Sequence, residues 1–422
     1  MLRGLLRHLH QACDRILGQG GSDALLGQGG DDWIDGGDDS DVLQGGLGRD
    51  TLKGGEGNDA IYGSSSGGFE LNANAPTRQH PILLGAGNNW FYEAEGVDGD
   101  GFQQRYLSGF VQRDQQAGDA GNLIDGGNGD DFIAAGSGAD IVDGGAGSDD
   151  ILGMGGNDIL FGGAERDRIY GDGPAAAGAN SVVKTAAESH GYDVIDGGAG
   201  NDLLLGQGKD DIVLGGSGDD VLYGDDRDDT NTPLTEHGND YLDGGAGEDT
   251  LHGNRGDDRL IGGADKDLLM GGEGRDIYIY NRGDGIDTII DKKADANILR
   301  FGEGIRSQDI TLRLGSLLLD LGNGDAIHLE NVIAEDASGI TYGFDPNDVR
   351  NNVAIASFEF ADGTTLTANE LLARGFDLDG SEGDDAIIED SGWPFGMRES
   401  RRWRHGEQRL RAANNNEWRR SA

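Results

Sequence analysis

A nine-residue rhythm of glycine, aspartate and aliphatic residues runs through most of the chain. In the stretch 45–53, Gly-Gly-Leu-Gly-Arg-Asp-Thr-Leu-Lys, two glycines open the unit, an aspartate follows, and an aliphatic residue stands two places later. The last three residues predict a very short strand whose middle side chain points inward. The glycine half predicts a tight turn, because glycine adopts positive φ without steric cost. Two units, about 18 residues, would close one turn of a coil.

The in-phase aspartates form four blocks and one lone copy near the end of the sequence, and Asn122 with Ile124 forms a degenerate extra unit. We predict that each aspartate supplies a carboxylate oxygen to a metal ion and that glycine-turn carbonyls complete the cage. All-oxygen cages with carboxylates suit Ca²⁺ better than transition metals, and Mg²⁺ demands stricter octahedral geometry. The candidate metal ligands are Asp23, Asp32, Asp41, Asp50, Asp59, Asp131, Asp140, Asp149, Asp158, Asp167, Asp193, Asp202, Asp211, Asp220, Asp240, Asp249, Asp258, Asp267, Asp276 and Asp385.

The unit Gly-Gly-x-Gly-x-Asp-x-aliphatic-x resembles the nonapeptide of the RTX (repeats-in-toxin, haemolysin-type calcium-binding) family. The resemblance covers residues 18–63, 117–171, 193–224 and 239–280. It implies an all-β fold, a right-handed parallel β-roll solenoid in which aliphatic side chains fill a thin interior between two parallel sheets. It also implies several bound Ca²⁺ ions, export through a type I secretion apparatus, and a secreted, extracellular or cell-surface location.

Composition favours a fold that depends on cations. The 422 residues include 79 glycines, and 78 acidic residues against 33 basic ones give a net charge of −45. Such self-repulsion opposes a compact state, so we expect the chain to unfold without Ca²⁺ and to gain folding energy from binding it. We expect no nucleic-acid partner, because phosphate recognition needs a basic surface. The single Cys13 excludes an intramolecular disulfide framework, and no apolar run reaches the ~18 residues of a transmembrane segment.

Three excursions interrupt the repeats, at residues 64–116, 172–192 and 225–238. The first is rich in aromatic residues, and we interpret it as an insertion that packs on the side of the roll or, alternatively, as a ligand- or partner-binding lobe. The other two leave after Gly-Asp and return through His-Gly-x-Asp, at His190 and His237. This shared pattern predicts loops anchored by histidine, with metal ligation by the two histidines as the alternative.

The segments outside the repeats have different patterns. Residues 1–17 predict a basic amphipathic helix that caps the first turn, with a membrane-surface helix as the alternative. Residues 281–376 are similar to the haemolysin-type calcium-binding-related domain that often follows such arrays, and predict a small β-rich cap. Within it we expect hairpins near 317–325 and 358–364, and then a short helix with a capping box of Thr367 and Glu370 and a stop at Gly375.

The end of the sequence carries an isolated repeat at 377–390 and an atypical arginine-rich tail at 391–422. Residues 398–422 hold 8 arginines and 3 glutamates. We hypothesise that a shifted reading frame produced this tail, because Arg402-Trp403-Arg404, if encoded as CGG-TGG-CGG, would be read as consecutive glycines one base later, as in the repeats. The alternative is a true anion-binding tail.

No catalytic constellation stands out, and we predict that the chain is not an enzyme. HExxH is absent, and Gly63-Ser64-Ser65-Ser66-Gly67 matches G-x-S-x-G without a strand–turn–helix context. We therefore predict calcium ion binding by a Ca²⁺-dependent folding module of a secreted bacterial RTX protein of the adhesin, toxin or bacteriocin-like type. The type I secretion apparatus and a cell-surface target are the expected further partners. The alternative is an active toxin or hydrolase whose effector site lies in 64–116.

Overall fold

A computed structural model describes the repeats and most of the segment that follows them. The described residues are 13–63, 121–172, 190–226, 237–291, 296–313, 317–336, 339–343 and 354–375, with short strands at 92–97, 103–106, 377–378, 385–387, 401–403 and 410–411. The interpretations of residues 1–12, of most of 64–116, of the two loop interiors and of most of 391–422 lie outside these ranges. The chain divides into two compact units, residues 1–244 and 245–422, and each is described by itself.

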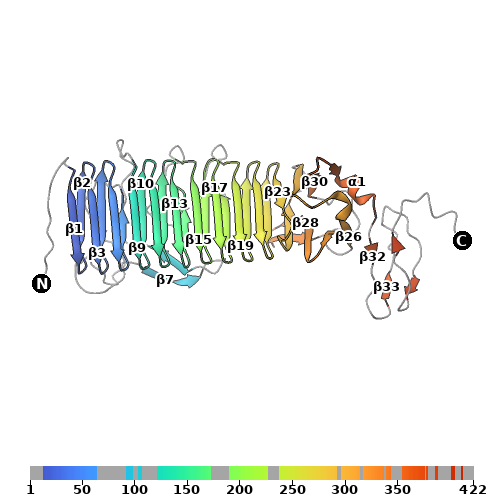
Figure 1. Ribbon diagram of the computed structural model, residues 1–422, viewed down its shortest axis with the longest axis horizontal. Coiled ribbons are helices and arrows are strands. Elements are labelled where there is room, and N and C mark those ends of the chain that lie inside the picture. Colours follow the sequence, from blue (N-terminus) through green and yellow to red (C-terminus); the bar gives the residue numbers. More distant parts are fainter. Residues whose placement is uncertain are drawn as a thin grey trace. The chain divides into compact units, whose positions relative to one another are not determined.

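In unit 1 the chain alternates between two sheets of parallel strands. Successive strands stand side by side in Figure 1. The first sheet contains, in spatial order, β1 (Arg15–Gly20), β3 (Trp33–Asp38), β5 (Thr51–Glu56), β9 (Leu123–Asn128), β11 (Ile141–Ala146), β13 (Ile159–Ala164), β15 (Val194–Ala199), β17 (Ile212–Ser217) and β19 (Tyr241–Ala246). The second sheet contains β2 (Ala24–Gly29), β4 (Val42–Leu47), β6 (Ala60–Tyr62), β10 (Phe132–Ser137), β12 (Asp150–Gly155), β14 (Arg168–Tyr170), β16 (Leu203–Gln207) and β18 (Val221–Asp225).

The predicted turn of 18 residues is confirmed by the strand register. Arg15 pairs with Trp33 and Ala24 with Val42, in each case 18 residues along the chain. The same register resumes across the first excursion, where Thr51 pairs with Leu123. Each excursion departs from a strand of the second sheet and returns to a strand of the first, and the turns before and after it still stack in order.

The interior is a thin double layer of aliphatic side chains, as the sequence predicts. The residue two places after each in-phase aspartate from Asp23 to Asp276 is buried in both sheets, and the first turns contribute Leu25, Ile34, Leu43, Leu52 and Ile61, all 8 % exposed or less. Buried and more exposed positions alternate along most strands of the first sheet. Each turn thus adds only two large inward side chains, so the apolar stabilisation per residue is small.

Two predictions about local structure are wrong. The predicted helix does not extend through residue 17, since β1 occupies Arg15–Gly20 and pairs with β3. Backbone pairing with the next turn overrides helix propensity there. Most strands of the roll are also longer than the predicted three residues, although β6 and β14 have that length. β5 covers six residues and includes Gly54 and Gly55, because glycines of successive turns stack in register (Gly37 with Gly55).

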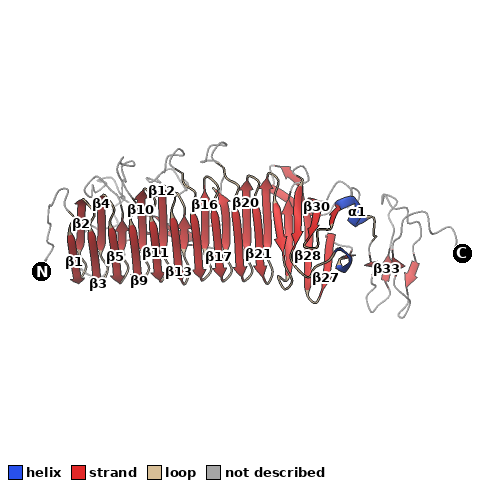
Figure 2. Ribbon diagram, turned by 45° about the horizontal axis from the view of Figure 1, so that its top comes forward, coloured by secondary structure: helices blue, strands red, loops and turns tan. Residues whose placement is uncertain are grey.

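Unit 2 continues the pattern and then changes to antiparallel pairing (Figure 2). Parallel neighbours are β20 (Thr250–Arg255), β22 (Leu268–Glu273), β24 (Ile286–Asp291) and β28 (Asp325–Asp336), and likewise β21 (Arg259–Ala264), β23 (Ile277–Tyr280), β25 (Asn297–Phe301) and β30 (Ile355–Phe360). The antiparallel additions are β26 (Thr311–Arg313), β27 (Leu317–Gly322), β29 (Gly339–Gly343) and β31 (Thr365–Thr367). Parallel pairing therefore extends beyond residue 280.

The short elements of this region form as the sequence predicts. β27 with β28 and β30 with β31 are the two expected hairpins. Helix α1 (Ala368–Leu372) begins at Thr367, whose hydroxyl accepts the backbone N–H of Glu370 while the Glu370 carboxylate accepts that of Thr367. Gly375, at φ 81°, follows the helix. No helix in the described ranges has the length and apolar character to cross a membrane.

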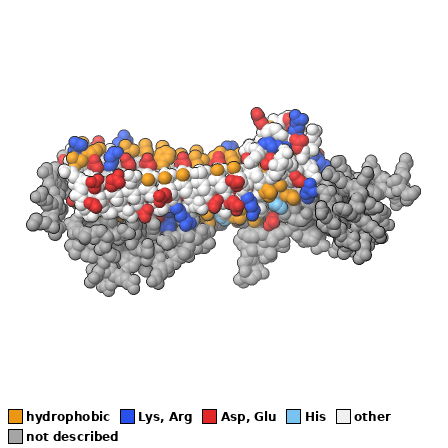
Figure 3. Space-filling model, turned by 60° about the horizontal axis from the view of Figure 1, so that its bottom comes forward, with side chains coloured by type: hydrophobic (Ala, Val, Ile, Leu, Met, Phe, Trp, Pro, Cys, Tyr) orange, Lys and Arg blue, Asp and Glu red, His pale blue; other side chains and the backbone are white. Residues whose placement is uncertain are grey.

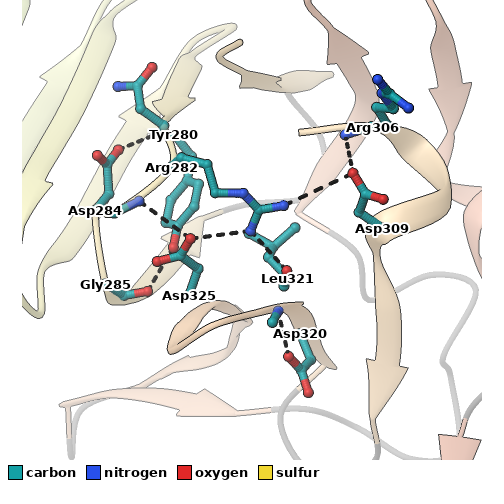
Figure 4. A network of polar contacts seen from close by, with 12 residues as sticks. Tyr280, Arg282, Asp284, Gly285, Arg306, Asp309, Asp320, Leu321 and Asp325 are labelled. Atoms are coloured by element: carbon teal, nitrogen blue, oxygen red, sulfur yellow. Dashed lines mark hydrogen bonds and ion pairs between the residues drawn. The ribbon is translucent and has the colours of Figure 1, made fainter. Parts of the chain in front are cut away.

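A polar network joins the end of the repeats in unit 2 to the β27–β28 hairpin (Figure 4). Arg282 Nη1 donates to the carbonyl of Leu321 at 2.8 Å and to Asp325 Oδ2 at 3.2 Å. The hydroxyl of Tyr280 donates to the carbonyl of Gly285 at 2.7 Å. One guanidinium thus ties the turn after β23 to the turn between β27 and β28, since arginine offers several donors in a fixed geometry.

Candidate metal sites

Within each unit, the in-phase residues line up in two rows, one along each edge of the stacked turns. Row A follows the strands of the second sheet and contains Asp14, Asp32, Asp50, Asn122, Asp140, Asp158, Asp193, Asp211 and Asp240 in unit 1 and Asp258, Asp276 and Asn297 in unit 2. Row B follows the strands of the first sheet and contains Asp23, Asp41, Asp59, Asp131, Asp149, Asp167, Asp202 and Asp220 in unit 1 and Asp249, Asp267 and Asp287 in unit 2. All three excursions interrupt the edge of row A.

Each row is held by one repeated hydrogen bond. Oδ1 of an in-phase residue accepts the backbone N–H of the equivalent residue one turn earlier, as Asp41 accepts from Asp23 at 2.7 Å and Asp131 from Asp59 at 2.6 Å. The bond persists across the second excursion, where Asp193 accepts from Asp158 at 2.7 Å. This bond fixes the carboxylate orientation and commits one oxygen to the protein.

The other carboxylate oxygen is buried. Oδ2 has no hydrogen-bond partner at nine of the described acids: Asp32, Asp41, Asp59, Asp131, Asp167, Asp193, Asp202, Asp211 and Asp267. A buried carboxylate oxygen without a donor is costly unless a cation neutralises it. The repetition of the feature over both rows indicates a cation site rather than an isolated packing defect.

The buried oxygens lie over glycines, beside backbone carbonyls of the next turn. A Cβ placed on Gly197 would lie 2.6 Å from Asp202 Oδ2 and 2.7 Å from the carbonyl oxygen of Gly215. On Gly206 it would lie 2.5 Å from both Asp211 Oδ2 and the carbonyl oxygen of Gly224. Glycine thus leaves a space lined by a carboxylate and a carbonyl oxygen, the donor set that Ca²⁺ prefers.

The proposed ligands include backbone carbonyl oxygens, so a cluster of side chains alone does not mark the sites. Within the described ranges, no three His, Cys, Asp or Glu side chains gather around one point. A cation here would take backbone carbonyls for part of its shell, as hard divalent cations commonly do.

Burial also raises the pKa values of the aspartates in the rows. Desolvation raises the pKa of Asp41 and Asp59 to about 7 and that of Asp131 and Asp167 to about 9, although the backbone hydrogen bond to each acid lowers it. Neighbouring acids add to the rise. Charged carboxylates are therefore disfavoured in the folded chain unless a positive charge compensates them.

Most candidate ligands occupy equivalent places, with two exceptions. Asp23 belongs to row B but is only partly buried, because it lies in the first described turn. Asp385 lies in β33 (Asp385–Ile387), which pairs antiparallel with β34 (Arg401–Trp403) in a separate two-stranded sheet. The structure therefore does not bring Asp385 into either row.

Sequence reasoning missed several members of the rows. Asp14 continues the nine-residue phase and has Ile16 two places later, but both residues lie in the segment whose pattern predicts a helix. Asp287 has Ile289 two places later but stands 20 residues after Asp267, out of phase. Asn297, an amide in place of an acid, gives no such signal.

At the end of row A in unit 2, a buried tyrosine replaces part of the repeat geometry. The Tyr278 hydroxyl accepts the N–H of Gly271 at 2.7 Å and contacts the carboxylate of Asp291. Asp291 also accepts from Asn297 Nδ2 at 2.6 Å. A Cβ on Gly271 would meet the Tyr278 hydroxyl where earlier turns place a carbonyl oxygen.

The two histidines lie at the bases of the loops. Nδ1 of His190 is 3.5 Å from Asp172 Oδ2, and Nδ1 of His237 is 3.0 Å from Asp225 Oδ2. Asp172 Oδ1 also accepts the N–H of Gly191 at 3.0 Å. Each histidine thus contacts the acid at which its own loop departs, an arrangement that suits a loop anchor.

Figure 3 shows one face of the repeats, largely white where backbone and small or uncharged polar residues are exposed. Acidic side chains stand out there in red as separate groups, and hydrophobic side chains lie along the repeats in orange.

Comparison with known families agrees with this geometry. The family model described as RTX calcium-binding nonapeptide repeat (4 copies) matches residues 14–43, 35–66, 116–151, 143–173, 191–208, 196–230, 236–251, 243–278 and 252–289. These ranges include every row residue from Asp14 to Asp287, and Asp385 lies outside them. No curated protein matches the chain. The parallel stacked turns, the two rows of acids and the repeat match together show that the chain belongs to the RTX family of haemolysin-type calcium-binding proteins.

Proposed function

We propose that the chain is a calcium-dependent folding module of a secreted bacterial protein, and that the row aspartates with the neighbouring glycine carbonyls hold the ions. The observation that carries the proposal is the set of buried Oδ2 atoms without hydrogen-bond partners, each placed over a glycine and, at all but Asp267, beside a carbonyl oxygen. Bound Ca²⁺ would supply the positive charge and the links between turns that this arrangement needs.

The balance of forces supports a coil without calcium. A net charge of −45 opposes compaction, and each 18-residue turn buries two large inward side chains against the entropy of ordering its backbone. The acids of both rows add a desolvation cost whenever they are charged. Without cations, these costs outweigh the gain from the thin core.

This property suits export. Extracellular calcium modules bind at roughly 10⁻⁴–10⁻³ M, far above cytosolic calcium. The chain would therefore stay unfolded inside the cell, pass the type I apparatus as a coil and fold outside, where a cell-surface target would meet the folded roll. The adhesin, toxin or bacteriocin-like type belongs to the same proposal.

Chain dimensions test the folding role. By small-angle scattering, an unfolded chain of this length has a radius of gyration of ~75 Å. We expect a value near this in chelator and a much smaller one in 10 mM Ca²⁺ (~10–100 times the expected Kd), with no comparable decrease in 10 mM Mg²⁺. Equal compactness in chelator and in calcium would refute the proposal.

The absence of enzyme activity belongs to the same proposal and has its own test. Lytic and hydrolytic assays would compare the full chain with a deletion of residues 64–116, both in calcium. We expect neither to be active. Activity that disappears only with the deletion would favour the effector reading of that segment.

A further inference from the structure

Row A contains one position in unit 1 where an amide replaces the carboxylate. Asn122 is 3 % exposed, and its Oδ1 accepts the backbone N–H of Asp50 at 2.9 Å, as the acids of the row do. Its backbone N–H in turn donates to Asp140 Oδ1. Asn122 therefore continues the row without carrying its charge.

The second atom of the amide stands where the metal-facing oxygen stands elsewhere. A Cβ on Gly63 would lie 2.6 Å from Asn122 Nδ2 and against the carbonyl oxygen of Ala135. At Gly206 the same two places belong to Asp211 Oδ2 and the Gly224 carbonyl. The amide orientation follows from the network, since the Asp50 N–H requires an acceptor and so places the oxygen on that side.

The amide nitrogen uses the carbonyl that would otherwise face a cation. Asn122 Nδ2 donates to the Ala135 carbonyl at 3.2 Å. An NH₂ group directs positive hydrogens into this space and offers no lone pair, so it repels a cation. Here the turn has both a donor and an acceptor satisfied without any metal.

We propose that Asn122 replaces one calcium ion of row A by a neutral hydrogen bond between turns. The inference rests on the proposed calcium sites in the neighbouring turns. Asn122 lies at the point where the repeats resume. It directly precedes β9, the first strand after the excursion at 64–116, and β9 pairs with β5 across 72 residues of sequence. At the edge of row A, the join between the two blocks of repeats is thus held without metal.

The decisive variant is Asn122→Asp, which keeps the Oδ1 acceptor and converts Nδ2 into a carboxylate oxygen. Equilibrium dialysis of the full chain with radioactive calcium counts the bound ions. We expect the variant to bind one ion more than the wild type. Asn128→Asp is the matched control: it adds the same charge at an exposed residue of the same turn, and its count should be unchanged.

The outcomes separate the inference from the proposed function. Equal ion counts for wild type and Asn122→Asp, with calcium bound by both, would overturn the inference and leave the calcium sites intact. No calcium bound by either chain would overturn both.

A second variant covers the case in which Asn122→Asp does not fold. Asn122→Ala removes both side-chain hydrogen bonds and no ion, so it should lower the urea midpoint equally at 1 and 10 mM Ca²⁺ (~10 and ~100 times a Kd of ~10⁻⁴ M). A loss that grows with calcium concentration would mean that Asn122 helps to hold an ion, contrary to the inference.

Discussion

Replacing one of the glycines beside a buried Oδ2 by alanine should remove one calcium ion, because the added methyl group occupies the space between the carboxylate and the carbonyl oxygen. In Gly197→Ala the new Cβ would lie 2.6 Å from Asp202 Oδ2 and 2.7 Å from the Gly215 carbonyl oxygen, inside the space assigned to the cation. Gly197 does not have positive φ, so alanine meets no backbone strain there. The substitution thus acts on the oxygen cage rather than on the turn conformation.

The magnitude follows from binding linkage. An ion with a Kd of about 10⁻⁴ M stabilises the folded chain by about 2.7 kcal/mol at 10 mM Ca²⁺ and by about 1.4 kcal/mol at 1 mM. The loss caused by Gly197→Ala should therefore grow by about 1.3 kcal/mol over this tenfold range. A purely steric cost would stay constant, because crowding in the folded chain does not depend on calcium.

Urea unfolding followed by far-UV circular dichroism at several calcium concentrations measures this difference. Gly29→Ala is the matched control, because its Cβ would lie no closer than 3.7 Å to the atoms of Leu47 and its φ is also not positive. The control should show no calcium-dependent loss. If the loss in Gly197→Ala were the same at 1 and 10 mM, ~10 and ~100 times the assumed Kd, the space would hold no cation and the reasoning would fail.

Two further predictions concern charge. Asp131→Asn keeps the acceptor for Asp59 but removes the negative charge, so it should cost up to about 2.7 kcal/mol of stability at 10 mM Ca²⁺ in urea unfolding, whereas the exposed Asp38→Asn should cost little. The pH dependence in chelator follows from the raised pKa values of about 7 for Asp41 and about 9 for Asp131, against an ordinary 3.8. The folded chain binds these protons more tightly, so this contribution is complete below about pH 4 and is lost as pH rises through about 7 to 9. Acidifying the chelated chain should therefore increase its β-structure by circular dichroism; more β-structure at pH 8 than at pH 5 would contradict this.

The repeat units were predictable because each of their residues has one local task. The aspartate phase and the aliphatic residue two places later suffice to place buried side chains such as Ile34 and Leu52, and turn chemistry suffices for the capping box at Thr367. Both depend on short-range geometry that a nine-residue window contains.

The features that sequence reasoning missed depend on neighbouring turns. β1 pairs with a strand 18 residues away, which outweighs the helical pattern of the preceding residues. The role of Asn122 needs the Ala135 carbonyl, and the Tyr278 hydroxyl, on β23 of one sheet, contacts Asp291 on β24 of the other. Asp385 shows the converse, since its local motif fits but its strand pairs elsewhere. The local sequence pattern therefore identifies each nine-residue repeat, whereas the contacts of each copy depend on the turns stacked beside it.

The most direct test of the account is a calcium titration of the purified full chain from thorough chelator, followed by far-UV circular dichroism and thermal melting. The account predicts a coil spectrum in chelator and a transition to β-structure at roughly 10⁻⁴–10⁻³ M free Ca²⁺. A complete β-spectrum with unchanged melting in chelator would contradict it, because the rows of buried acids would then be stable without the ions assigned to them.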